Sequence, residues 1–293
     1  MNLLKDIIAT YSKKRKQEKY IATLRQITPP TKIRSSLFED KVTFKHIGLI
    51  GDIIYSIPCM LALANDKNIE LYLDLSQKSM YPKGHKHYNG DKILTPNSVE
   101  FLAPLILSNP KFTICKAHDN EAIDYDLNEF RRYPFDYRMG HICRWYFFTF
   151  AVNYDLGKNW ISVTKKEELT REIIISRSFR YRAPTIEYNF LAKFNNISFI
   201  GLEDEYLDMK KVIPNLKHIK VLNALDLAQT IAGCKFFIGN QSFSFAVAEA
   251  IKIKRVLEVC YETPNVIPEG QNGFDFCFQP QFEKIVMDLI HNA

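Results

Sequence analysis

An acidic residue in the first third of the chain could take part in chemistry, because it follows a predicted buried strand. In HIGLIGDIIYSIP, from His46 to Pro58, a buried strand is predicted to end at Gly51, and Asp52 opens the next helix. Gly51 permits a tight turn with a close approach of the backbone. At the C-terminal end of a parallel strand the Asp52 carboxylate would face the usual ligand site, where it could take part in catalysis. The alternative is that Asp52 only caps the helix.

A second group combines arginines with hydroxyl side chains directly after another predicted strand. It lies in IIISRSFRYRAP, from Ile173 to Pro184. Arginine offers a planar fork of donors and serine adds single donors, so the group suits a diphosphate. A solvated basic loop is the alternative. The candidate residues are Ser176, Arg177, Ser178, Arg180 and Arg182.

A third group stands at the start of a helix rich in small residues. In FFIGNQSFSFAVAEA a strand is followed by Asn240, Gln241 and Ser242, which head the helix. The N–H groups and the positive end of the helix dipole favour an anion there. A well-capped turn between strand and helix is the alternative.

Two acids follow a further predicted strand, in FIGLEDEY. Glu203 and Glu205 could hold the hydroxyls of a ribose. They could equally be first-turn acids that the helix dipole favours. Both interpretations stay open from the sequence.

Metal chemistry has little support in the sequence. The six cysteines are widely spaced without a C-x-x-C pair, which indicates buried thiols in a reducing cytoplasm. His85 and His87 have no evident third ligand, and we interpret them as residues of a polar loop from Ser76 to Asp91. No Asp-x-Asp motif stands in a suitable place. The sequence therefore predicts no metal site.

Alternating strands and helices must position these groups. The alternation runs from Thr43 to Val152 and starts again from Glu172 to His291. Such repeats require right-handed crossovers and mostly parallel sheets, so we expect an α/β protein with two Rossmann-like domains facing a cleft. The predicted units are a tail (1–34), an N-terminal domain (35–165) and a C-terminal domain (166–293).

The net charge of +6 is concentrated in the tail. Residues 1–34 hold nine basic and two acidic residues and carry +7, so the remaining chain carries −1. A neutral body argues against nucleic acid as a partner. Apolar residues at helical spacing, followed by Lys13–Lys16 and Lys19, predict a basic amphipathic helix. It would lie on an anionic membrane surface or pack against the body.

The compartment follows from two further features. The start lacks the pattern of a signal peptide, and the most apolar stretch, residues 145–152, is too short to span a bilayer. We therefore expect a cytoplasmic protein, with the tail as a means of attachment to the inner face of the membrane.

Taken together, these segments resemble glycosyltransferase family 9, the heptosyltransferase-like enzymes with the GT-B fold. The similarity runs from Thr43 to about Asp288. HIGLIGDIIYSIPCMLALA resembles the N-terminal signature of the family, and LNALDLAQTIAGCKFFIGNQS resembles its leucine-rich helix, strand and diphosphate turn. The Asp-Ser-Gly of that turn reads Gln241-Ser242-Phe243 here, and the usual histidine is Ala246.

The resemblance implies an inverting, metal-independent transfer of heptose or a related hexose from a nucleotide diphosphate sugar to a cell-surface glycan or lipid-linked acceptor. Asp52 would be the general base, and no cofactor beyond the donor is implied. A 2-epimerase of nucleotide sugars and a non-catalytic binding module are the alternatives. The N-terminal domain would be the acceptor side, and the C-terminal domain would bind the nucleotide sugar. The donor would contact Gly51, Ser176, Arg177, Ser178, Arg180, Arg182, Glu203, Glu205, Asn240, Gln241 and Ser242.

Overall fold

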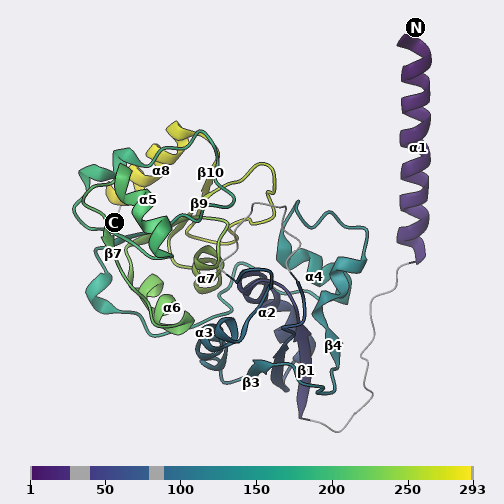
Figure 1. Cartoon of the computed structure of the whole chain (residues 1–293), viewed down its shortest axis with the longest axis horizontal. Coiled ribbons are helices and arrows are strands. Elements are labelled where there is room, and N and C mark those ends of the chain that lie inside the picture. Colours follow the sequence, from purple (N-terminus) through teal and green to yellow (C-terminus); the bar gives the residue numbers. More distant parts are fainter. Residues whose placement is uncertain (1, 27–39, 79–88, 292–293) are drawn as a thin grey trace.

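Two parallel β-sheets with helices packed around them make up the body of the computed structural model (Figure 1). The structure describes residues 2–26, 40–78 and 89–291, with side chains from residue 8 onward. Most of the polar stretch from Ser76 to Asp91, including His85 and His87, lies outside these residues. The expected α/β class is confirmed.

The N-terminal sheet has four strands in the order β3-β2-β1-β4. Its central strand β1 is buried along most of its length, since helices cover the sheet. The strands are β1 (Lys41–His46), β2 (Asn68–Leu73), β3 (Phe112–Ala117) and β4 (Tyr125–Asp126). The helices are α2 (Ile50–Ala64), α3 (Pro96–Leu107), the 3₁₀ helix η1 (Leu127–Arg132) and α4 (Ile142–Phe150).

The C-terminal sheet has six strands in the order β10-β9-β8-β5-β6-β7. Its central strands β5, β8 and β9 are buried throughout, as expected of parallel strands covered on both faces. The strands are β5 (Ile173–Ser176), β6 (Ile197–Phe199), β7 (Lys217–His218), β8 (Phe236–Asn240), β9 (Arg255–Glu258) and β10 (Gly273–Phe276). The helices are η2 (Glu167–Leu169), η3 (Asn189–Lys193), α5 (Glu203–Val212), α6 (Ala224–Gly233), α7 (Phe243–Ile251) and α8 (Gln279–His291).

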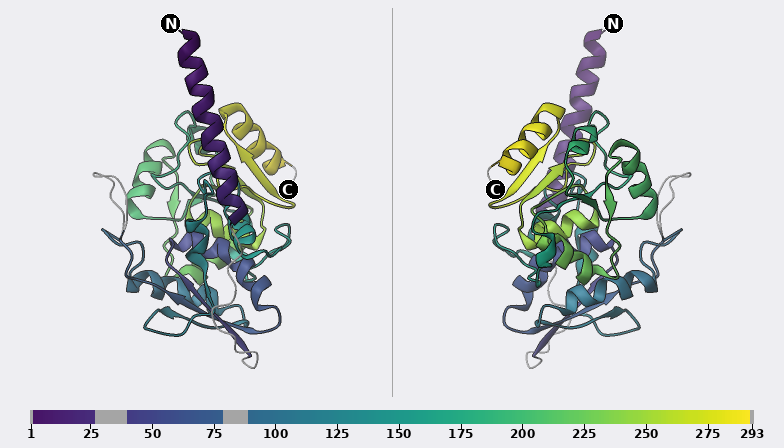
Figure 2. Two further views of the ribbon diagram at one scale, coloured as in Figure 1. Left: turned by 90° about the vertical axis from the view of Figure 1, so that its right-hand side faces the viewer. Right: turned by 90° about the vertical axis from the view of Figure 1, so that its left-hand side faces the viewer.

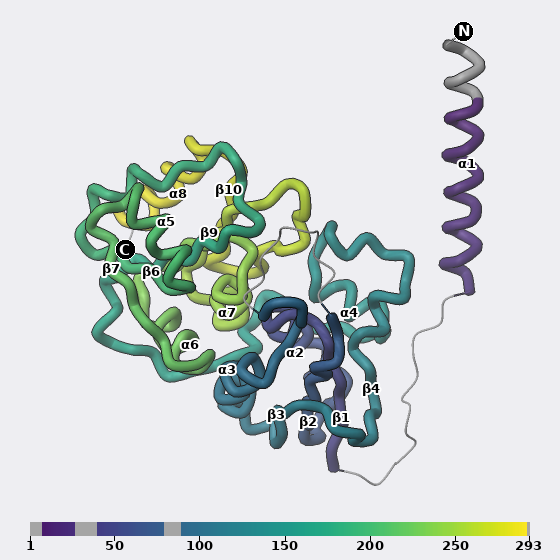
Figure 3. Tube along the Cα trace, viewed as in Figure 1, coloured from purple at the N-terminus to yellow at the C-terminus, as the bar shows by residue number. Residues whose placement is uncertain are grey.

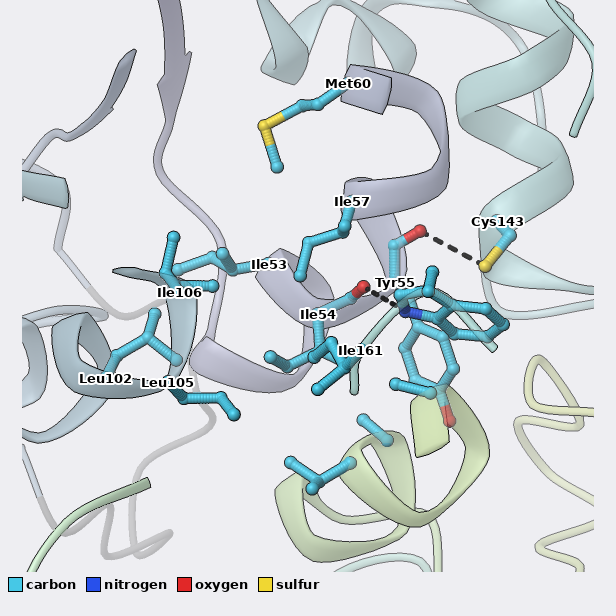
Figure 4. Close-up of a cluster of buried hydrophobic side chains, with 14 of the residues drawn as sticks. Ile53, Ile54, Tyr55, Ile57, Met60, Leu102, Leu105, Ile106, Cys143 and Ile161 are labelled. Carbon is cyan, nitrogen blue, oxygen red and sulfur yellow. Dashed lines mark hydrogen bonds between the residues drawn. The ribbon is translucent and has the colours of Figure 1, made fainter. Parts of the chain in front are cut away.

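The two halves pack through helices, and Figure 3 follows the chain from one to the other. Helix α2 contacts α7 and α3 contacts α6, so one apolar core extends across both halves. Residues of α2 and α3 both contribute to it, among them Ile53 of α2 and Ile106 of α3 (Figure 4). The connecting segment is fixed to both halves, because Trp160 donates from Nε1 to Ile54 O at 3.1 Å and from its backbone to Ala250 O at 3.0 Å. The domain boundaries at residues 34 and 165 stay predictions.

The aromatic-rich run from Tyr137 to Val152 has the composition of one long helix, but in the structure α4 begins only at Ile142. Gly140 has a φ of +80°, in the left-handed region that favours glycine. The Nδ1 atom of His141 accepts the Cys143 N–H at 3.1 Å and caps the helix. The residues before His141 therefore form a loop against α4.

The tail contains helix α1 (Asn2–Gln26), which stands apart from the body in Figure 1 and lies in front of it and behind it in the two views of Figure 2. The predicted helix is thus present. The side chains of Ile8 and Tyr11 are exposed, so the body does not cover them. Among the described helices, α1 included, we find none with the length and apolar character needed to cross a membrane.

Candidate active site

The carboxylate of Asp52 lies in the first turn of α2 and does not cap it. The N-cap residue is Leu49, and Asp52 is the third residue of the helix. The carboxylate turns instead toward η1, where Asp52 Oδ2 accepts a hydrogen bond of 3.0 Å from Arg131 Nη2. The Asp52 side chain keeps 26% of its surface exposed. It is therefore both oriented and accessible, as a proton acceptor must be.

A buried histidine shapes the turn that carries Asp52. His46 ends β1, and its Nδ1 accepts the Gly48 N–H at 2.8 Å. This places the ring proton on Nε2, which donates to the Tyr146 hydroxyl at 2.9 Å. Burial, together with the charge of Arg131, lowers the pKa of His46 to about 3, so the ring is neutral. His46 fixes the turn without adding charge.

Arg131 is held in place by aromatic rings. Its guanidinium carbon lies 4.7 Å from the centre of the Phe130 ring and 5.4 Å from that of Tyr137. These cation–π contacts restrict the side chain while its Nη2 bonds Asp52. The fixed guanidinium therefore defines the position of the Asp52 carboxylate.

The turn between β8 and α7 lies directly opposite Asp52's own turn. A Cβ placed on Gly51 would lie 3.7 Å from the Cα of Phe243, the first residue of α7. Ser242 caps α7, because its Oγ accepts the Phe245 N–H at 3.4 Å. The structure thus brings together the first and the third group of candidate residues. The first turn of α2, which carries Asp52, therefore lies beside the positive end of α7.

The two amides of the β8–α7 turn hold neighbouring loops. Asn240 donates from Nδ2 to Ser178 O and Arg180 O, at 3.0 and 2.6 Å. Gln241 donates to Thr263 O at 2.7 Å and accepts the Cys260 N–H at 3.0 Å. Both side chains are buried. They shape the site through the loops that they bind.

All three arginines after β5 contact other groups of the protein. Arg177 makes a two-pronged ion pair with the buried Glu258, at 2.7 and 2.8 Å. Arg182 donates to Asp208 at 2.7 Å and to Ser178 O at 2.9 Å. Arg180 lies over the Tyr181 ring at 5.4 Å. A diphosphate would have to compete with Glu258 for Arg177.

The remaining hydroxyls and acids divide into buried and accessible ones. Ser176 is buried at the end of β5, and Ser178 Oγ donates to Arg180 O at 3.0 Å. Glu205 is buried and accepts the Leu202 N–H at 3.3 Å, the arrangement of a first-turn acid, and burial raises its pKa. Glu203 is exposed beside Lys220, 3.6 Å away. Of the two acids, only Glu203 is open to a ligand.

The comparison with known proteins rests on structure. No family model matches the sequence, and no curated protein matches it either. The structure of an ADP-heptose lps heptosyltransferase II from E. coli matches with a TM-score of 0.57 at 13% identity, covering 86% of this chain and 99% of that one. A family 9 glycosyl transferase from Veillonella parvula gives 0.54 at 12%, covering 86% and 89%. E. coli heptosyltransferase WaaC with ADP gives 0.54 at 10%, covering 86% and 100%. The chain has the GT-B fold of these glycosyltransferases.

Within this GT-B fold, three residues of the site region escaped the sequence analysis. His46 carried a weak signal, as a histidine that ends a buried strand two residues before a glycine. Arg131 lies 79 positions from its partner Asp52, and Glu258 lies 81 positions from Arg177. Pairs so far apart leave no periodic pattern in a single sequence, so only the fold reveals them.

Proposed function

We propose that the chain is a glycosyltransferase that moves a sugar from a nucleotide diphosphate sugar to an acceptor hydroxyl. The observation that carries the proposal is the close approach of the first turn of α2, which carries Asp52, to the N-terminus of α7 in a GT-B fold. One matched structure is of a heptosyltransferase with ADP, and another is of an ADP-heptose lps heptosyltransferase. We therefore take heptose or a related hexose as the donor sugar. The acceptor would be a cell-surface glycan or a lipid-linked sugar at the inner face of the membrane.

The reaction would be a single displacement with inversion. Asp52 takes the proton of the acceptor hydroxyl while that oxygen bonds to the anomeric carbon. The bond from this carbon to the diphosphate breaks, and the leaving group takes the electron pair. The growing negative charge would lie against Ser242 and the first N–H groups of α7, which are oriented before the reaction begins. These donors would stabilise the leaving group without a metal.

The nucleoside end of the donor would lie near Glu203, at the C-terminal end of β6. Glu203 is accessible and could accept hydrogen bonds from ribose hydroxyls. Leu222, two residues after Lys220, leaves 88% of its surface exposed. An exposed apolar side chain suits contact with the planar base of a nucleotide.

The first step of the test identifies which nucleotide sugar binds. Thermal shifts with ADP-, GDP- and UDP-sugars identify the nucleotide, since binding at a hundredfold excess over Kd stabilises by about 2.7 kcal/mol. We then expect Asp52→Asn to retain nucleotide binding and to reduce transfer by about 10²-fold or more. Asp66→Asn, an exposed acid after α2, is the matched control. Unchanged turnover in Asp52→Asn would disprove its role as the base.

A non-catalytic binding module is the second candidate. It is favoured by Gln241, whose amide is engaged by backbone groups, and by Phe243, whose ring packs on Phe101 of α3 with centres 5.8 Å apart. Binding of a nucleotide sugar with neither transfer nor hydrolysis, across all acceptors tried, would support this candidate instead.

A further inference from the structure

A group of aromatic and apolar side chains lies on the surface beside η1 and α4. We call it the aromatic surface. Three of its members are strongly exposed: Phe148 by 59%, Met139 by 47% and Tyr137 by 40%. Scattered single apolar residues on a surface are normal, but a contiguous group indicates a binding site. The aromatic surface consists of Tyr133, Phe135, Tyr137, Met139, Trp145 and Phe148.

The aromatic surface is ordered by contacts of its own. Phe135 stacks between Tyr133 and Trp145, with ring centres 5.5 and 4.9 Å apart. Trp145 donates from Nε1 to Met139 O at 2.9 Å, which ties the loop to α4. From the C-terminal half, Asn265 donates to Tyr137 O at 2.9 Å. Rings held in this way lose little conformational entropy when a ligand binds.

The aromatic surface is continuous with the candidate base. The Tyr137 ring lies 5.4 Å from the guanidinium carbon of Arg131, and Arg131 bonds Asp52 at 3.0 Å. A substrate whose hydroxyl reaches Asp52 can therefore extend over Tyr137 toward Phe148. The surface belongs to the half that would carry the acceptor.

The charges around the aromatic surface are balanced. Each of three exposed arginines has an acidic partner: Arg132 pairs with Glu129 at 2.7 Å, Arg138 with Asp136 at 3.0 Å and Arg144 with Glu269 at 2.5 Å. A protein surface that binds an anionic lipid surface or a phosphorylated glycan usually carries a net positive charge. A balanced rim of ion pairs instead suits a neutral partner that exchanges hydrogen bonds with both signs of charge.

We propose that the aromatic surface binds a neutral sugar of the acceptor, on the basis of the proposed glycosyltransferase function. A sugar ring presents an apolar face of C–H groups, which can lie on Tyr137 and Phe148. Its hydroxyl edge can bond the arginine and carboxylate groups of the rim. The aromatic surface thus selects an uncharged sugar next to the hydroxyl that reacts.

The test uses the full chain and the fluorescence of its two tryptophans. Trp160 is buried, so a change in emission on binding reports Trp145. The probes are dephosphorylated core oligosaccharide freed from lipopolysaccharide, the same oligosaccharide with its phosphates, and phosphatidylglycerol vesicles. We expect the dephosphorylated probe to shift the emission, and Trp145→Phe to abolish the signal. Calorimetry then measures binding independently of fluorescence.

Two variants decide the proposal. We expect Phe148→Ser and Tyr137→Ala to weaken oligosaccharide binding at least fivefold and to leave ADP binding unchanged. Phe278→Ser, an exposed aromatic before α8, is the matched control and should bind both ligands normally. If ADP binds and no oligosaccharide does, or if only vesicles or only the phosphorylated probe bind, the inference is wrong. Absence of nucleotide binding would instead contradict the proposed function.

Discussion

The Nδ1 atom of His46 accepts a hydrogen bond of 2.8 Å from the backbone N–H of Gly48. The imidazole ring therefore lies directly under the turn that leads to Asp52. A Cβ on Gly48 would lie 2.6 Å from Cε1 of His46 and 3.0 Å from Oδ2 of Asp52. The position of the candidate base thus depends on a glycine at position 48, three residues before Gly51.

We expect Gly48→Ala to destabilise the fold by about 1–3 kcal/mol, the usual cost of overpacking, and to lower transfer by displacing Asp52. Gly51→Ala is the control, because its new Cβ would meet Phe243 at an ordinary 3.7 Å. Urea denaturation gives both free energies of unfolding. Equal stability of the two variants would contradict the role assigned to Gly48.

The same histidine should make stability depend on pH. Burial, with the charge of Arg131, lowers the pKa of His46 from 6.5 to about 3. Between these values the unfolded chain binds a proton that the folded chain does not, so stability falls as the pH drops from 6.5. The slope is up to about 1.4 kcal/mol per pH unit for this histidine.

His46→Asn should flatten that slope, because asparagine keeps an acceptor near Nδ1 and does not titrate. His141, whose pKa burial lowers to about 4, would account for part of the remaining slope. His291→Asn at the exposed end of α8 is the control and should behave like the wild type. Urea unfolding at pH 7, 6, 5 and 4.5 measures the effect. An unchanged slope in His46→Asn would show that His46 is not the titrating group.

The order of elements was predictable from the sequence, because runs of buried β-branched residues alternate with apolar helices. The strand predicted at Glu172 to Ser176 is β5, one residue shorter. The placement of Asp52 beyond β1 was also predictable, because strand ends share one edge of a parallel sheet. The partners of the polar groups were not predictable. Arg177 follows a strand, as a phosphate-binding residue would, but it forms an ion pair with an acid that is far away in the sequence.

Variants of Arg177 test whether this residue stabilises the fold or binds a phosphate. Glu258 is fully buried and also accepts hydrogen bonds from the Ala183 N–H and the Tyr188 hydroxyl. Arg177→Met would leave this carboxylate without its counter-charge, and we expect a loss of about 3–5 kcal/mol in urea unfolding. The double variant Arg177→Met/Glu258→Gln should recover most of the loss.

Nucleotide binding by the double variant then distinguishes a structural role of Arg177 from a contact of Arg177 with the ligand. If Arg177 serves the fold, ADP should bind the double variant with a Kd within about threefold of the wild type. A stable double variant that loses affinity for ADP by tenfold or more, about 1.4 kcal/mol, would show that Arg177 contacts the diphosphate.

The tail should bring the protein to anionic membranes through charge. Lys13, Lys14 and Lys16 of α1 are exposed, and each cation near such a surface contributes about 1 kcal/mol. Replacing the three by glutamine should therefore weaken binding to phosphatidylglycerol vesicles by about two orders of magnitude at low salt, and less at high salt. The matched control replaces three exposed lysines of the body, Lys158, Lys217 and Lys284. If vesicle sedimentation finds the two triple variants equal, the tail has a different role, and its charge of +7 does not direct the protein to lipid.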